Sequence, residues 1–203
     1  GKITNGLFAP WMMFKKAFMD IGGHDPRFAS AREDSDVFNR LHLAGFELIQ
    51  SWESFVYHLT ARGGQFQHGK LTKEHTQKSE EWQKLMNNST REFFRKWGTP
   101  VLHDNLLKPI VPPKYDIGFV VKNCNEQMLE HLEPWCSTIY TDHNFDAKYY
   151  IEKEQPNTVV KLDDKIQSIY GKKTNDIEVR FDGNKLNQQN FNYMTQLSQI
   201  LTN

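Results

Sequence analysis

The chain has 203 residues, 38% of them apolar and 25% charged, and its 25 basic residues balance its 25 acidic residues. A neutral chain has no excess of positive charge to draw it to nucleic acid or to an anionic membrane, and no apolar run is long enough for a transmembrane segment. The two cysteines, Cys124 and Cys136, are too few for a disulfide framework, so we expect reduced thiols in a cytoplasmic protein.

Short elements separated by glycine are expected in the first half of the chain. The apolar run LFAPWMMF at residues 7–14 predicts a buried strand, and the residues after it predict a short helix that ends at Gly22 and Gly23. The later elements are expected in this order: a loop at 24–30, a helix at 33–44 ended by Gly45, strands at 46–50 and 54–59, and one or two helices within 71–97.

One glycine and four prolines between residues 98 and 114 predict a linker. We place it at 108–114, which divides the chain into domains at 1–107 and 115–203. The second domain is predicted to alternate strands at 116–121, 137–142, 157–162 and 176–182 with helices at 125–135, 147–155 and 187–201. Such alternation is typical of a small α/β domain.

The acidic segment EDSDVFNRLHLAG, which starts at Glu33, carries the strongest chemical signal. On a helical wheel, one apolar stripe is formed by Val37, Phe38, Leu41 and Ala44. Asp34 falls near the middle of this stripe and Glu33 at its edge. Asp36 and Arg40 fall on the opposite side, where they are expected to pair in solvent. A carboxylate on the core side of a helix costs several kcal/mol if it is buried alone, so Asp34 needs a cap role, a partner or a cleft.

Two interpretations of Asp34 are open. In the first, Asp34 is an N-cap or complements the helix dipole, each effect being worth about 0.3–1 kcal/mol. In the second, Asp34 faces a cleft and acts as a base. The segment alone favours the first interpretation, and its neighbours in the sequence favour the second.

Those neighbours form an ordered series: Gly22, Gly23, Asp25, Phe28, Glu33, Asp34, Asp36, Arg40, Leu41, Gly45 and His58. The series resembles the carboxy-terminal half of the catalytic domain of family 2 glycosyltransferases, which have the GT-A fold. The segment NSTREFFRKWG at residues 88–98 resembles the helix that often follows this domain. The resemblance covers residues 1–98 and implies a partial GT-A half-domain, an α/β fold, followed by the small α/β domain.

The resemblance implies transfer of a sugar, with inversion, from a nucleotide-sugar donor to a hydroxyl of a glycan or another acceptor. Asp34 would be the general base that takes the proton of this hydroxyl, and Glu33 would orient the acceptor. The other implied roles are substrate binding by Gly22, Gly23, Asp25 and Arg40, and binding of a divalent cation, Mn²⁺ or Mg²⁺, by His58.

The family's amino-terminal half, with its nucleotide-binding strands and Asp-x-Asp metal motif, is not part of this sequence. We therefore expect a fragment of a longer protein or a remnant of the acceptor half, and whether the chain is itself an enzyme stays open. The alternative is a non-catalytic interaction module derived from a glycosyltransferase. A metal-dependent hydrolase built on His24, His42 and His58 has no HxH or HExxH spacing to support it. Open strand edges in a half-domain would favour a homo-oligomer.

Overall fold

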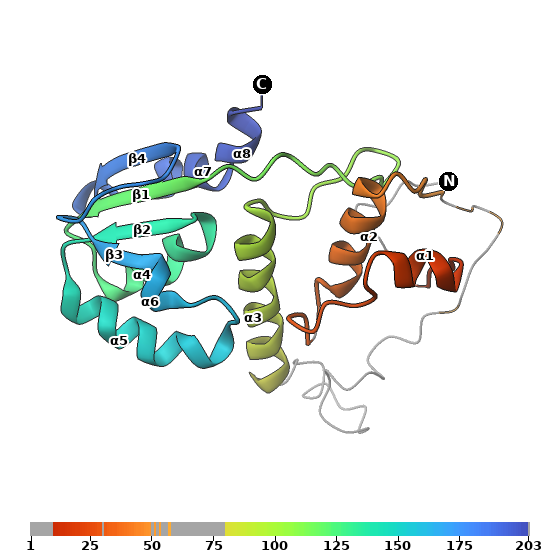
Figure 1. Ribbon diagram of the computed structural model, residues 1–203, viewed down its shortest axis with the longest axis horizontal. Coiled ribbons are helices and arrows are strands. Elements are labelled where there is room, and N and C mark those ends of the chain that lie inside the picture. Colours follow the sequence, from red (N-terminus) through yellow and green to blue (C-terminus); the bar gives the residue numbers. More distant parts are fainter. Residues whose placement is uncertain are drawn as a thin grey trace, which may run out of the picture. The chain divides into compact units, whose positions relative to one another are not determined.

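The computed structural model describes residues 10–29, 31–49, 51, 53, 57 and 80–202, and Figure 1 shows their elements. The chain forms two compact units. Unit 1 contains the described residues up to Thr90 together with Val101–Ile110, and unit 2 contains Arg91–Pro100 and Val111–Asn203. The helix expected within 71–97 is confirmed as α3 (Glu80–Trp97), whose first eleven residues belong to unit 1 and the rest to unit 2. The domain division at 108–114 stays a prediction.

Unit 1 contains two short helices, α1 (Lys15–Asp20) and α2 (Glu33–Leu43), in agreement with the sequence. The chain leaves α1 through Gly22 and Gly23, whose φ angles of +86° and +69° favour glycine, and the Gly23 N–H donates to the carbonyl of Phe18. Gly45, with φ +82°, follows the end of α2 as predicted. Val37, Phe38 and Leu41 of α2 are buried with Ala17 of α1, as the helical wheel predicts, whereas Ala44, the fourth residue of the predicted stripe, lies beyond the end of α2 and is exposed.

The predicted strand at residues 7–14 is wrong for the part that the structure describes, residues 10–14, which is irregular. Trp11 and Met13 pack against the α1–α2 cluster, whereas Met12 and Phe14 are 98% and 87% exposed. The side chains thus alternate as they would in a strand, but no strand of the described chain pairs with this segment. Residues 46–49 of the predicted strand at 46–50 are irregular as well, and the strand predicted at 54–59 lies outside the described residues except for Tyr57.

Unit 2 contains a four-stranded parallel sheet in the order β3–β2–β1–β4. The strands are β1 (Ile117–Lys122), β2 (Thr138–Thr141), β3 (Ile166–Ser168) and β4 (Ile177–Asp182). The helices are α4 (Glu126–Leu132), α5 (Asn144–Glu154), α6 (Leu162–Lys165), α7 (Gln188–Thr195) and α8 (Leu197–Ile200), with single turns η2 (Glu133–Trp135), η3 (Gln155–Asn157) and η4 (Gly183–Lys185). The predicted α/β class is confirmed at this level, as a mixed architecture with a parallel sheet.

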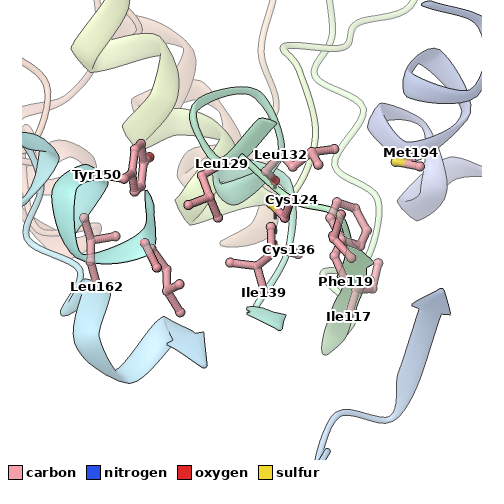
Figure 2. Close-up of a cluster of buried hydrophobic side chains, with 13 residues drawn as sticks. Ile117, Phe119, Cys124, Leu129, Leu132, Cys136, Ile139, Tyr150, Leu162 and Met194 are labelled. Atoms are coloured by element: carbon pink, nitrogen blue, oxygen red, sulfur yellow. Dashed lines mark hydrogen bonds between the residues drawn. The ribbon is translucent and has the colours of Figure 1, made fainter. Parts of the chain in front are cut away.

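The core of unit 2 lies between one face of the sheet and the helices. Alternate strand residues, among them Phe119 and Ile139, meet Leu129 and Leu132 of α4 and Tyr150 of α5, and Figure 2 shows these side chains gathered together. Cys124 and Cys136 lie in the same cluster as free thiols, and burial raises their pKa to about 11 and about 12. Among the described residues, no helix is long and apolar enough to cross a membrane.

The strand predicted at 157–162 is wrong, because these backbone groups bond to a side chain instead of a neighbouring strand. The Gln155 amide donates to the carbonyl of Val160, 2.9 Å away, and its oxygen accepts the Leu162 N–H, also at 2.9 Å. The chain therefore curls through η3 into α6 and joins the sheet only at β3. The strands predicted at 116–121, 137–142 and 176–182 are confirmed as β1, β2 and β4, within one residue at their ends.

A buried ion-pair network joins residues 91–97 of α3 to the rest of unit 2. Arg95 lies 2.6 Å from Glu133, 2.7 Å from Glu154 and 2.7 Å from Glu92. Lys165 lies 2.7 Å from Glu133 on the other side. Burial alone raises the pKa of Glu133, but the charges of Lys165 and Arg95 and their hydrogen bonds outweigh it and lower this pKa to about 2. Glu133 therefore stays ionised inside the unit.

Candidate functional site

The candidate site of unit 1 centres on a contact between Trp11 and Asp34. The indole Nε1 of Trp11 donates to Oδ1 of Asp34 over 3.0 Å, although the two residues are 23 positions apart. The contact forms because Trp11 packs against the apolar cluster of α1 and α2, which brings its ring to the start of α2. Asp34 is partly buried, on the side of α2 that the helical wheel predicts.

The start of α2 does not use a carboxylate as its cap. The N-cap is Arg32, whose φ of +70° is left-handed and whose side chain makes no capping bond, and Ala31 before it has φ +66°. The interpretation of Asp34 as an N-cap is therefore wrong, since Asp34 is the second residue of the helix. The other part of that interpretation, that a negative charge in the first turn complements the helix dipole, suits the position of Asp34.

Glu33 adjoins Asp34 and has an unsatisfied atom. Its Oε2 is buried and has no hydrogen-bond partner in the described part of the chain. Arg32 beside it is half-buried, and burial lowers the Arg32 pKa while the charge of Glu33 raises it. Buried polar atoms are nearly always hydrogen-bonded, so this oxygen is an exception within the described part of unit 1.

Among the substrate-binding residues inferred from the resemblance, Arg40 contacts the Gly22–Gly23 turn. Its guanidinium donates to the carbonyls of Ile21 and Gly23, at 2.5 and 2.6 Å, and lies 2.8 Å from Asp36. Asp36 is fully buried, so the prediction that this pair lies in solvent is wrong. The reason is that the turn after α1 covers this side of α2, which a wheel of one helix cannot show. Arg40 thereby fixes the Gly22–Gly23 turn to α2.

Asp25 is held by a residue next to it. Both of its carboxylate oxygens accept from the guanidinium of Arg27, the shortest distance being 2.7 Å, and the Arg27 N–H closes a tight turn on Oδ1. Asp25 and Arg27 thus form the loop between α1 and α2. A role of Asp25 in binding substrate stays a prediction.

A hollow of about 440 Å³ opens beside Trp11. It is lined by Trp11, Met12, Met13, Lys15, Phe18 and His24. The rings of Phe18 and His24 meet edge to face at 5.1 Å between centroids, and each lies about 6 Å from that of Trp11. These rings give the hollow an apolar wall, and Asp34 reaches it only through its hydrogen bond to Trp11, since it is not among the lining residues. Sequence reasoning missed Trp11, because the apolar run predicted only a buried strand, and it considered His24 only for a metal-dependent hydrolase.

His58, the predicted metal ligand, lies outside the described residues. Within the described part of the chain, no group of three or more His, Cys, Asp or Glu side chains could hold a metal ion. The described residues therefore do not form a metal site.

The usual ligand position of a parallel sheet is closed in unit 2. Ligands of such sheets bind at the carboxyl ends of the strands where the strand order reverses, which here lies between β1 and β4. At that place Asn123 donates to Asp182 over 2.8 Å, and a Cβ on Gly183 would lie only 2.6 Å from the Asn123 carbonyl oxygen. The chain's own atoms fill this position, and the hollow of about 360 Å³ in unit 2 lies instead beside the ends of β2 and β3, at Thr141 and Ser168.

Comparison of the chain with protein-family models, with curated proteins and with solved structures gave no match. A function for the chain therefore has to be inferred from the residues around Asp34.

Proposed function

We propose that unit 1 is the acceptor side of an inverting glycosyltransferase of the GT-A type, related to family 2. In this proposal Asp34 takes the proton from an acceptor hydroxyl as its oxygen attacks the anomeric carbon of a nucleotide sugar. The observation that carries the proposal is the 3.0 Å hydrogen bond from Trp11 to Asp34 Oδ1. This bond holds the carboxylate of Asp34 against Trp11, which is one of the residues that line the hollow.

The neighbouring groups support this assignment. A sugar ring resting on the ring of Trp11 would bring its hydroxyls towards Asp34, the hydrogen-bond partner of Trp11. Gly22, Gly23 and Arg40 would hold the turn that borders the acceptor. His58 as a ligand of a divalent cation, Mn²⁺ or Mg²⁺, belongs to the proposal as well.

The donor nucleotide sugar would bind to the family's amino-terminal half, which this sequence does not include. The proposal for these 203 residues is therefore limited to acceptor binding and proton removal. The buried free thiols of Cys124 and Cys136 suit a reducing compartment, and we propose the cytoplasm.

The test uses a longer protein that includes the donor-binding half, and it measures nucleotide release from nucleotide-sugar donors in the presence of Mn²⁺ and hydroxyl acceptors. Asp34→Asn should lower turnover by about 10²–10⁴-fold, because asparagine keeps an oxygen for Trp11 but cannot take a proton. Asp20→Asn is the matched control, since Asp20 is exposed and pairs only with Lys16 in the described chain, and it should leave turnover unchanged. If the Asp34→Asn variant keeps nearly full turnover, Asp34 is not the general base.

Calorimetry with uridine diphosphate and Mn²⁺ distinguishes the transferase from the alternative, a non-catalytic interaction module. Clear micromolar binding by the chain argues for a transferase that keeps part of a donor site. If the chain shows neither binding nor transfer, the interaction module derived from a glycosyltransferase replaces the enzyme.

A further inference from the structure

Strand β4 leaves one edge of the sheet of unit 2 open. Among the described residues it pairs with β1 alone, along all six of its residues. The Ile177 N–H donates to the carbonyl of Asp116 next to β1, at 3.1 Å. Because backbone direction alternates along a strand, Val179 and Phe181 also point their N–H and C=O groups at β1. The N–H and C=O groups of Glu178, Arg180 and Asp182 therefore point outward.

The opposite edge of the sheet is protected. Strand β3 has only three residues, and the Ser168 carbonyl at its end already accepts the Gly171 N–H over 3.0 Å. Natural sheets blunt their edges in this way, with short strands and folded-back chain. Strand β4 is twice as long and contains no proline. The sheet thus has one edge able to accept another strand.

We propose that the partner of this edge is β4 of a second copy of the chain, paired antiparallel about a two-fold axis at Val179. In this register Glu178 lies opposite Arg180 of the second copy, and the reverse pair forms across the axis. Both residues point their backbone groups outward, so each pair also exchanges two backbone hydrogen bonds. In a two-fold contact the same surface of both copies meets itself, so that surface has to be self-complementary. The outward face of β4 meets this condition at Glu178 and Arg180, which pair with each other across the axis.

Charge selects this register over its neighbours. Moving one strand by two residues in one direction places Arg180 opposite itself and Glu178 opposite Asp182. Moving it in the other direction places Glu178 opposite itself and leaves only three residues of each strand paired. Like charges directly opposite each other destabilise a sheet, whereas opposite charges stabilise it. Of the two registers that pair five residues of each strand, only the one centred on Val179 places Glu178 opposite Arg180, and it places Asp182 opposite Asp176 of the second copy, beyond the end of the strand.

The side chains of β4 fit this arrangement. Arg180 and Glu178 are 65% and 30% exposed and pair with each other along the single strand, so they are free to exchange partners across the axis. On the core face Ile177, Val179 and Phe181 are only partly buried, although they pack against the cluster of unit 2. Ile177 would lie opposite Phe181 of the second copy, which removes more apolar surface from water.

The mass of the full chain in solution, from light scattering after gel filtration, tests the proposal. The wild-type chain should be a dimer, and Arg180→Glu should raise its dissociation constant at least tenfold, because acids then face acids across the axis. The double variant Glu178→Arg with Arg180→Glu is the matched control, since it restores both opposite-charge pairs and should restore the dimer. A monomeric wild-type chain, or a double variant as weak as the single one, would overturn the proposal.

Cross-linking tests the register itself. Val179→Cys places two thiols opposite each other on the axis, in a pair without backbone hydrogen bonds, where the Cβ atoms come close enough for a disulfide. Mild oxidation should link the two copies covalently, whereas Ile177→Cys should give no link because its opposite residue is Phe181. Equal linking by both variants would show that the copies do not meet in this register.

Discussion

Arg95 Nη2 lies 2.6 Å from Glu133 Oε2, and their side chains are 1% and 0% exposed. The contact joins positions 38 apart, and it is one of four ion pairs by which Arg95 and Lys165 neutralise three acids of the interior. A buried charge is tolerated only with such partners. Removing one base from this network is therefore more damaging than removing a surface charge.

Arg95→Met should lower the free energy of unfolding by about 3–5 kcal/mol, because it keeps the bulk of the side chain but leaves the acids with too few positive charges. Urea denaturation followed by far-ultraviolet circular dichroism measures this loss. Lys16→Met is the matched control, since Lys16 is 84% exposed in its pair with Asp20, and its effect should stay within about 0.5 kcal/mol. Similar losses in the two variants would contradict a buried network.

Acid should destabilise unit 2 through Glu133. Its pKa is about 2 in the folded chain and 4.5 in the reference state, so the unfolded chain takes up the proton first as pH falls. The stabilisation is complete above pH of about 4.5 and is lost between there and about 2, with a total on the order of 3 kcal/mol. Urea midpoints at a series of pH values across this window measure the effect. The urea midpoint of the Glu133→Gln variant should fall less steeply with decreasing pH over the same window. An equal slope in the two proteins would rule out Glu133 as the source of the acid sensitivity.

Gly183→Ala should destabilise unit 2 by about 1–3 kcal/mol, the usual cost of overpacking. The new Cβ would lie 2.6 Å from the Asn123 carbonyl oxygen and 2.6 Å from the Met128 sulfur, and a backbone atom cannot move aside as a side chain can. Thermal unfolding of this variant beside Gly171→Ala gives the comparison, because the nearest atom at Gly171 is 3.3 Å away. If the two variants unfold at the same temperature, the close approach of Gly183 to the Asn123 carbonyl oxygen does not contribute to stability.

The parts of the fold that follow from local pattern were predictable from the sequence. Strands β1, β2 and β4 are continuous or alternating apolar runs, and α2 has a clear apolar stripe and a glycine beyond its end. Strand β3 was missed because three residues are too few for a periodic signal. The false strand at 157–162 arose because its valines suit a strand, whereas the Gln155 side chain takes its backbone bonds.

The candidate site was predictable in part. The wheel placed Asp34 on the inner side of α2, where Trp11 reaches it, but a pattern within one helix contains no information about a ring 23 positions away. The same limitation hid the burial of Asp36, which results from the turn after α1 and its bonds to Arg40. Long-range contacts of this kind depend on the packing of separate elements, which no single segment encodes.

The division of α3 has a consequence for gene rearrangement. The compositional boundary lies among the prolines near residue 110, yet Arg91 and Arg95, which neutralise the interior of unit 2, precede it in the chain. A recombination crossover at the prolines would transfer the sheet without its arginines, which leaves Glu133 with Lys165 alone and removes both arginine partners of Glu154. A transferable cassette must therefore begin upstream of residue 91, inside what is otherwise one uninterrupted helix.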